Sequence, residues 1–303
     1  MGRDCVDARL DQVPLLAGSP RTVERLPGGL TNLNLKVTTS DGRYVVRLFQ
    51  GDADLLGIDR DAEHQNSVAA AEAGVGAEVL DYLPDLGMLV IGHIEGTTYD
   101  NASFARPGVI TRVAGACRTL HHGPRFVNDF DMFARQPGYR RTVRDNGYAL
   151  FEGYDDFDVR FRQVREALAV RDEGTVPCNN DLLAGNFVDD GDKLWLIDYE
   201  YAGNNDACFE LGNITTECEL DLGQLEELVT AYYGRHLRNK VARTRLQAVV
   251  SEYGWSLWGA IQASASSLDF DFMAWGRERF EKAAAGFGSA DFTRLLEEVQ
   301  RAD

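Results

Sequence analysis

The fold is decided by the stretch Asn180-Asp181-Leu182-Leu183-Ala184-Gly185-Asn186, together with Ile197-Asp198-Tyr199, which follows after ten intervening residues. An Asp here precedes an Asn by five positions, and a second Asp follows the Asn. The residues between them form two largely apolar runs around Asp190-Gly191, which predicts two strands joined by a tight turn. Such a hairpin would bring Asn186 and Asp198 side by side.

This pattern of two Asp residues and one Asn is typical of the catalytic loop of protein-kinase-like phosphotransferases. In that loop the first Asp, here Asp181, accepts the proton of the attacking hydroxyl, and Asn186 and Asp198 would hold Mg²⁺. Asp and Asn also fill turns for structural reasons, which would explain an isolated pair five residues apart. The predicted hairpin and the position of the second Asp favour the catalytic interpretation.

The composition is that of a globular chain with a substantial core. Its 303 residues, 44% of them hydrophobic, suffice for two domains or for one domain of two lobes. No apolar run approaches the ~20 residues of a membrane-spanning helix. The N-terminus lacks an apolar signal region, so we expect a cytoplasmic protein. Five scattered cysteines predict free thiols rather than a zinc site or disulfide framework.

The net charge of −17 argues against a nucleic-acid-binding surface, which would need a basic patch. A small cationic substrate fits the summed field of the protein better. An acidic composition also serves solubility or a salty habitat, so charge alone does not identify the substrate.

The first ninety-odd residues predict a small antiparallel sheet. Its strands are expected at residues 21–26, 33–38, 43–49 and 88–91. The turn between the first two contains Gly28, Gly29, Thr31 and Asn32. Such a glycine-containing turn can place backbone N–H groups over phosphates, although a plain hairpin turn would look the same.

Arg47 shares one strand face with Val45 and Phe49. A cation on an apolar face needs a partner, because an unpaired buried charge is costly. The expected partner is Glu63, on a helix predicted at residues 59–73. This pair would match the cation–carboxylate pair of kinases, with Arg47 clamping phosphates. The alternative is a surface Arg and a surface Glu that do not meet.

Beyond Gly92 the chain predicts mainly helices, at residues 109–121, 158–171, 222–237, 246–264, 275–285 and 291–301. The predicted fold is therefore α+β and bilobal, like a protein kinase. A small antiparallel-sheet lobe (residues 1–94) would precede a large, mainly helical lobe (95–303). The nucleotide would bind in the cleft between them, with backbone groups near Gly92 and Ile94 against the adenine.

The chain resembles the choline/ethanolamine kinases, within the aminoglycoside-phosphotransferase-like group. The resemblance is carried by Gly28–Asn32, Tyr44–Leu48, Asn180–Asn186 and Ile197–Gly203. The last segment, with Glu-Tyr-Ala-Gly after Asp198, is far more specific than a general kinase signature. The resemblance implies an ATP- and Mg²⁺-dependent kinase that phosphorylates the hydroxyl of a small amino alcohol, with choline as the first candidate.

The resemblance also implies a pocket for the substrate's ammonium group, lined by Tyr201, Glu217, Trp255, Trp258, Phe270 and Trp275. Trp255 and Trp258 lie three residues apart and would project from one helical face. A trimethylammonium group makes no strong hydrogen bonds, so aromatic faces are its natural receptor. A Trp pair at helical spacing also fits ordinary core packing.

Asn179 departs from the family, which usually carries His at this position. That His orients the loop, and Asn also offers a donor and an acceptor, so we expect activity to be retained. Residues 204–208 also differ from the usual pattern, which leaves ethanolamine or another amino alcohol open. Further alternatives are a pseudokinase without turnover and a kinase of a bulkier, aminoglycoside-like polycation. An oligomer is compatible with the sequence.

Overall fold

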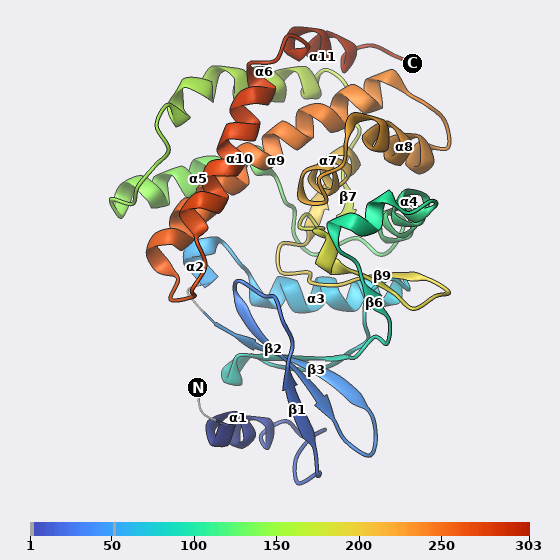
Figure 1. The fold of residues 1–303 in the computed structure, drawn as a ribbon, viewed down its shortest axis with the longest axis vertical. Helices are drawn as coiled ribbons and strands as arrows, with labels where there is room; N and C mark the ends of the chain where they lie inside the picture. The colour runs from blue at the N-terminus through green and yellow to red at the C-terminus, as the bar shows by residue number, and fades with distance from the viewer. Residues whose placement is uncertain (1–2, 51–52) are drawn as a thin grey trace.

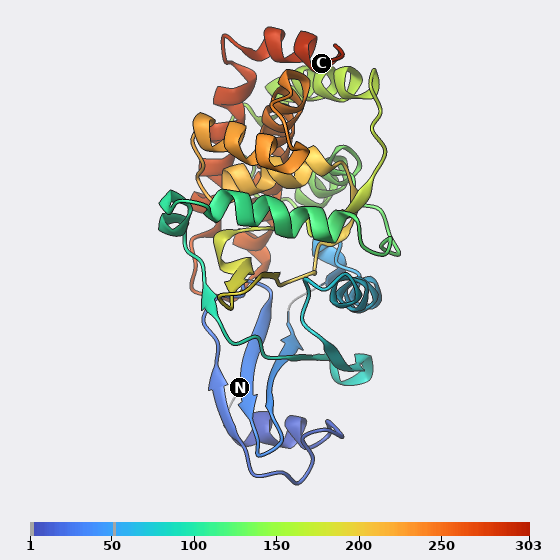
Figure 2. The same cartoon turned by 90° about the vertical axis from the view of Figure 1, so that its right-hand side faces the viewer.

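The computed structural model describes residues 3–50 and 53–303. A sheet lies at the end of the molecule that holds the N-terminus, and most helices lie at the other end (Figure 1). The same division is seen after a quarter turn (Figure 2). The antiparallel sheet has the order β1-β2-β3-β5-β4 and consists of β1 Thr22–Arg25, β2 Asn32–Thr38, β3 Arg43–Phe49, β4 Val79–Leu83 and β5 Met88–Gly92.

The sheet has its own apolar core on one face. The side chains of Leu10, Val13 and Leu16, which end helix α1 (Arg3–Leu10) and follow it, are fully buried against Val46 and other strand residues. Alternate residues of β3 face opposite sides of the sheet. Arg47 therefore points away from this core, towards helix α3.

The second face of the sheet is covered by α3 (Arg60–Glu72), which lies between the sheet and the helical part (Figure 1). Asp59 caps this helix by accepting a hydrogen bond from the Ala62 N–H at 3.0 Å. The helix predicted at residues 59–73 is therefore present, as are the four predicted strands. The sequence did not predict α1, β4 or the short helix α2 (Ala53–Leu56).

The helical part is built around the long helix α9, which packs against α5, α7 and α10. Its helices are α4 Val109–His121, α5 Met132–Asp145, α6 Asp158–Ala169, α7 Ala207–Glu217, α8 Leu222–Tyr233, α9 Arg238–Ala265, α10 Phe272–Phe287 and α11 Phe292–Glu298. The six predicted helices are all present, and α9 begins eight residues before the expected start.

Helices α5 and α7 were not predicted, because each breaks a local rule. Pro137 lies inside α5 and cannot donate the usual backbone hydrogen bond. Helix α7 contains Gly212 and a β-branched run from Ile214 to Thr216, which are weak helix formers. Most of α7 is buried against α9, so tertiary packing overrides its low propensity.

The hairpin predicted between Asn186 and Asp198 is present. Strand β8 (Phe187–Asp189) pairs antiparallel with β9 (Leu194–Leu196), and Gly191 in the turn has a φ of 98°. The remaining short elements are β6 Thr97–Thr98, β7 Val176–Cys178, β10 Gly203–Asn205, and the 3-10 turns Pro84–Leu86, Asn101–Ala105, Tyr154–Phe157 and Ala184–Asn186.

Among the described residues, no helix combines the length and apolar character needed to cross a membrane. The described thiols, Cys117, Cys178, Cys208 and Cys218, are free and buried, in agreement with the sequence. The side chain of Cys5 lies outside the described part of the structure.

Gly212 tests the close packing of α7 on α9. A Cβ atom at this position would lie 2.7 Å from the Ala248 backbone nitrogen and 2.8 Å from the Thr244 carbonyl oxygen. We expect Gly212→Ala to lower the free energy of unfolding by about 1–3 kcal/mol, because backbone atoms cannot yield locally. Urea denaturation measures this change.

Gly115→Ala in α4 is the matched control, because no described atom lies within 4 Å of its added methyl group. Its stability should be unchanged or higher by about 0.5–1 kcal/mol. Equal stability of the two variants would show that α7 and α9 are not tightly packed at Gly212.

Candidate active site

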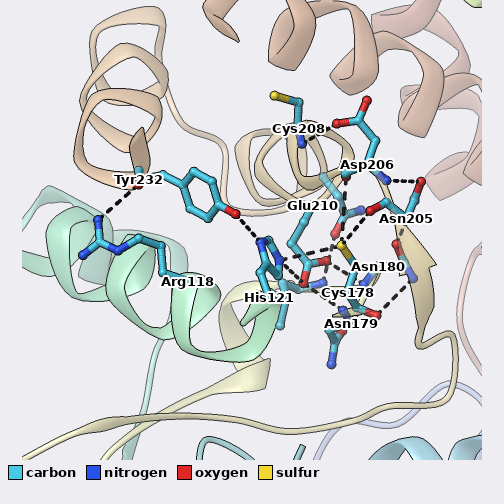
Figure 3. Close-up of polar contacts among 12 residues, drawn as sticks. Arg118, His121, Cys178, Asn179, Asn180, Asn205, Asp206, Cys208, Glu210 and Tyr232 are labelled. Carbon is cyan, nitrogen blue, oxygen red and sulfur yellow. Dashed lines mark hydrogen bonds and ion pairs between the residues drawn. The ribbon is translucent and has the colours of Figure 1, made fainter. Parts of the chain in front are cut away.

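The loop from Asn179 to Asn186 is held by hydrogen bonds to two side chains of helix α7. The Glu210 carboxylate, fully buried, accepts the backbone N–H of Asn179 at 2.8 Å and that of Asn180 at 2.6 Å (Figure 3). The Asn213 side-chain oxygen accepts the N–H of Leu182 at 2.9 Å. Hydrogen bonds to a buried carboxylate are strong, so α7 fixes the backbone on both sides of Asp181.

Glu210 is itself surrounded by buried polar groups. Figure 3 shows the His121 ring between Tyr232 and Glu210. Its Nδ1 lies 2.7 Å from the Tyr232 hydroxyl, and its Nε2 lies 3.7 Å from both Glu210 Oε1 and Cys178 Sγ. These His, Cys and Glu side chains are close enough to suggest a metal site. Both oxygens of Glu210 already accept backbone N–H groups, so we assign the cluster to holding the loop.

Asn180 shows why the loop needs this support. Its φ is 68°, a left-handed conformation that costs a non-glycine residue roughly 1–2 kcal/mol. Its side-chain amide donates to the carbonyls of Cys178, Tyr201 and Gly203 at 3.1–3.2 Å. These contacts stabilise the strained backbone conformation of Asn180, immediately before Asp181.

Asn179 ties the loop to the segment that carries Asp198. Its Nδ2 donates to the Ile197 carbonyl at 3.2 Å and to the Asp198 carbonyl at 2.8 Å. Its Oδ1 accepts the Asp181 N–H at 3.1 Å. Asn179 thus makes the orienting contacts that the sequence analysis expected of its side chain.

The structure brings Asp181, Asn186 and Asp198 together. The Asn186 Nδ2 donates to the Asp181 carbonyl at 2.7 Å, and the Ile197 N–H donates to the Asn186 carbonyl at 3.0 Å. The first contact leaves the Asn186 side-chain oxygen free to act as a ligand. Carboxylate and amide oxygens are the ligands that Mg²⁺ prefers, so this donor set fits the ion expected from the sequence.

The expected ion pair between Arg47 and Glu63 is present, at 2.7 Å, and both side chains are buried. Arg47 also contacts Asp198 Oδ1 at 2.6 Å. Arg60 continues the line of charges, since its guanidinium lies 2.7 Å from both Glu63 and Glu200. We call this series, from Asp198 through Arg47, Glu63 and Arg60 to Glu200, the charge chain.

Arg60 and Glu200 were missed as site residues. Two local signals could have found them. Arg60 precedes Glu63 by three residues, so both lie on one face of the predicted helix. Glu200 follows Asp198 by two residues, inside the segment that resembles the kinase family.

The glycine-containing turn closes onto Glu200. The Thr31 hydroxyl donates to Glu200 Oε2 at 2.6 Å, and the Asn32 amide donates to Oε1 at 3.1 Å. Gly29 has a φ of 83°, and a Cβ atom there would lie 2.8 Å from the Asn32 carbonyl oxygen, so the turn requires glycine. Gly28 also has a φ of 83°. Burial, with Asp198 and Glu63 nearby, raises the pKa of Glu200 to about 7.

A small cavity lies between the sheet and the β9 side of the site. It is lined by Arg47, Ser67, Ala77, Leu89, Ile91, Ile197, Asp198 and Tyr199. Gly92 and Ile94, which we expected to meet the adenine, are not among these residues. The Gly92 N–H is bonded to the Glu78 carbonyl at 2.8 Å, so that donor is already used within the sheet.

Asp181 lies among other acidic groups. Burial raises its pKa well above the usual range, and the carboxylates of Glu217, Asp198 and Glu200 act in the same direction. Arg279 has the opposite effect. A divalent cation beside Asp198 would also lower the pKa of Asp181. A carboxyl tuned in this way suits a general base.

Tyr201, Trp255, Trp258 and Trp275 form one group of rings, which we call the aromatic cluster. The Trp258 indole N–H donates to the Tyr201 hydroxyl at 2.7 Å. The Tyr201 and Trp255 ring centroids lie 4.8 Å apart, and those of Trp258 and Trp275 lie 5.3 Å apart. Phe270 is 42% exposed and packs edge-on against Phe272, at the margin of this cluster.

Glu217, the last residue of α7, already has a cationic partner. Arg279 from α10 contacts its Oε2 at 2.5 Å. The Arg279 guanidinium also lies 3.4 Å above the Trp275 ring. The family resemblance predicts that Glu217 meets the substrate's ammonium group, and it predicts no role for Arg279. The structure provides Glu217 with an internal cation.

Comparison with known proteins gives a consistent family. A family model described as Choline/ethanolamine kinase matches residues 23–232. Ethanolamine kinase 2 of Rattus norvegicus is 33% identical over 322 residues, covering 92% of this chain and 83% of that protein. A crystal structure of a choline/ethanolamine kinase family protein from Mesorhizobium loti has a TM-score of 0.87 at 34% identity and covers 99% of both chains. A structure of LicA in complex with AMP shares the fold, with a TM-score of 0.75 at 22% identity, covering 96% and 97%.

The Mesorhizobium loti structure is matched over 99% of this chain, so the likeness extends over both the sheet and the helical part. The bilobal, protein-kinase-like fold predicted from the sequence is therefore confirmed. The enzyme class expected from Asp181, Asn186 and Asp198, a small-molecule kinase that phosphorylates an alcohol, is confirmed as well. The chain belongs to the choline/ethanolamine kinase family.

Proposed function

We propose that this chain transfers the γ-phosphoryl group of ATP to the hydroxyl of a small amino alcohol, with choline preferred over ethanolamine. The observation that carries the proposal is the position of Asp181. Its loop is tied to Asn186 and to the Asp198 segment, and Glu217 and Arg279 lie close enough to act on its pKa. One pocket would thus join a phosphate site to an ammonium site.

In this mechanism Asp181 accepts a hydrogen bond from the substrate hydroxyl and takes its proton during attack. Asn179 and Asn186 hold the Asp181 backbone, so the carboxylate is aimed in advance. Arg47, fixed by Glu63, clamps phosphate oxygens. When bound, Mg²⁺ neutralises charge on the β- and γ-phosphates, and Asn186 and Asp198 would hold it.

The nucleotide would bind between a lobe of residues 1–94 and a lobe of residues 95–303. The turn from Gly28 to Asn32 would cover its phosphates, and Leu89, Ile91 and Ile197 offer apolar walls for the base. ATP is supported by the AMP held in the LicA structure. We place the enzyme in the cytoplasm, where ATP and buried free thiols are both expected.

Choline is favoured by the chemistry of the aromatic cluster. Trp255 and Trp258 are 4% and 5% exposed, so a cation against their faces would be largely desolvated. Ethanolamine is the second candidate, because a rat ethanolamine kinase is 33% identical to this chain. Release of ADP from saturating Mg-ATP, measured with choline, ethanolamine and aminoglycosides in turn, tests the proposal. No stimulation by any of them would favour a pseudokinase.

Asp181→Asn should separate catalysis from nucleotide binding. We expect turnover to fall by roughly 10²–10⁴-fold, the range for loss of a general base. ATP affinity, measured by calorimetry, should stay nearly unchanged. Asp192→Asn, in the exposed turn of the β8–β9 hairpin, is the matched control and should keep full turnover. Near-normal activity of the Asp181 variant would remove this residue from the mechanism.

Asn179 tests the link between the loop and Asp198. Asn179→Ala loses three hydrogen bonds, so we expect kcat to fall by about 10-fold or more with little change in KM for ATP. Asn179→His restores a donor at this position and should preserve or raise kcat. A folded Asn179→His variant with a strongly reduced kcat would show that the surrounding network accepts only Asn.

Trp258→Leu and Trp255→Leu test the aromatic cluster. Each removes the face of a ring, so choline affinity should fall roughly 5- to 30-fold while ATP affinity changes little. Trp195→Leu is the control, because Trp195 lies in the β8–β9 hairpin and packs under Lys193. Equal losses for choline and ethanolamine, with a lower Tm, would identify these tryptophans as core residues only.

A further inference from the structure

Asn66 is a fully buried side chain at the contact between α3 and the helical part. Its Nδ2 donates to the Ala202 carbonyl at 3.0 Å and to Asn128 Oδ1 at 2.7 Å. Its Oδ1 accepts the backbone N–H of Val127 at 3.1 Å. Both ends of this one amide are therefore bonded to segments of the helical part.

The position of Asn66 on α3 relates it to the phosphate clamp. Asn66 follows Glu63 by three residues, so the two side chains lie on the same side of the helix, one turn apart. Glu63 holds Arg47 at 2.7 Å. Ala202 follows Asp198 by four residues. Asn66 thus joins the helix that holds Arg47 to the segment that carries Asp198.

The charge chain by itself is a changeable anchor for α3. Arg47 contacts Asp198 at 2.6 Å, but in the proposed function Asp198 holds Mg²⁺ and Arg47 holds phosphate oxygens. That contact would be exchanged when the nucleotide binds. Arg60 also ties α3 to Glu200, but burial raises the pKa of Glu200 to about 7, so this carboxyl is only partly ionised at neutral pH. The bonds of Asn66 are uncharged and do not depend on this exchange.

We propose that Asn66 is a positioning residue for phosphoryl transfer, which docks α3 onto the segment after Asp198 and so sets where Glu63 holds Arg47. The proposal rests on the proposed function, since it assumes that Arg47 clamps phosphates. The three partners of the Asn66 side chain are all protein groups, so it acts through Glu63 and not by contact with the nucleotide.

Loss of the Asn66 side chain would release α3 and leave the segment after Asp198 in place. The Ala202 carbonyl would still accept the Asn128 Nδ2 at 3.1 Å. The carbonyls on either side of Ala202 are both held by the Asn180 amide. The effect should therefore fall on nucleotide binding and not on the aromatic cluster.

Asn66→Ala tests the proposal, with Mg-ATP affinity measured by calorimetry and KM measured for the amino alcohol. We expect Mg-ATP affinity to fall by about 10-fold or more, because three hydrogen bonds that fix α3 behind Arg47 are lost. The KM for the amino alcohol should stay within about 3-fold of wild type. Unchanged Mg-ATP affinity, or equal losses for the two ligands, overturns the proposal.

Gln136→Ala is the matched control, because it also removes a buried amide. Gln136 is 3% exposed and donates to the Tyr154 hydroxyl at 3.1 Å, on α5 and away from the phosphate clamp. Its Tm should fall while Mg-ATP affinity stays at the wild-type value. A loss of affinity as large as that of Asn66→Ala would attribute both losses to general destabilisation and refute the role of Asn66.

Asn66→Ser covers the case in which Asn66→Ala does not fold. Its hydroxyl keeps one donor on a shorter side chain, so Mg-ATP affinity should fall by at least about 3-fold. Wild-type affinity in a folded Asn66→Ser variant would show that α3 does not need these bonds.

A double-mutant cycle with Glu63→Gln distinguishes positioning from a merely structural role. Because Asn66 acts through Glu63, adding Asn66→Ala to Glu63→Gln should lower Mg-ATP affinity by no more than about 2-fold further. Fully additive losses would contradict this coupling and overturn the proposal. Wild-type protein that binds Mg-ATP but phosphorylates no amino alcohol would refute the proposed function alone, since the affinity cycle would still decide the role of Asn66.

Discussion

The arrangement of the molecule depends on the pairing of buried charges between the sheet and the helical part. The charge chain runs from Asp198 through Arg47, Glu63 and Arg60 to Glu200, with contacts of 2.6–2.7 Å. A charge held in such a place without its partner would be strongly destabilising. The strand, α3 and the segment after β9 are therefore tied together at the place where nucleotide phosphates are proposed to bind.

The loop from Asn179 to Asn186, proposed as the catalytic loop, is held by buried hydrogen bonds to helix α7 and to nearby carbonyl groups. Glu210 and Asn213 on α7 accept loop N–H groups, and Asn180 donates to three carbonyls. These bonds hold Asn180 at its left-handed φ of 68°, and Asn179, which donates to the Asp198 carbonyl, helps to hold Asp198 at its φ of 66°. Such conformations persist only when the surroundings determine them fully, and they are often found at functional sites. A helix of low intrinsic propensity thus provides the rigid base of the site.

The proposed ammonium site combines the apolar area of the aromatic cluster with the Glu217 carboxylate, which Arg279 neutralises. The aromatic cluster belongs to the same buried core as much of α9, so its rings are fixed by packing. Arg279 and Glu217 add a charged pair without adding net charge. The charge close to the aromatic cluster is therefore balanced locally. The net charge of −17 affects only the long-range field of the protein.

The sequence by itself determined what depends on short spacing. The distance from Asp181 to Asn186, the hairpin that leads to Asp198, strand 43–49 and helix 59–73 all follow from local periodicity and turn chemistry. The Arg47–Glu63 pair, sixteen residues apart, could be inferred because an inward-facing cation needs a partner on the next helix. Only the tertiary structure decided that Glu200 joins Thr31 and Asn32, and that Arg279 occupies Glu217. Glu200 lies at least 168 residues from Thr31 and Asn32 in the sequence, and Arg279 lies 62 residues from Glu217. Several carboxylates could have accepted hydrogen bonds from each of these donors. Helices α5 and α7 could not be predicted from the sequence either, because packing against the distant helix α9, and not local propensity, stabilises them.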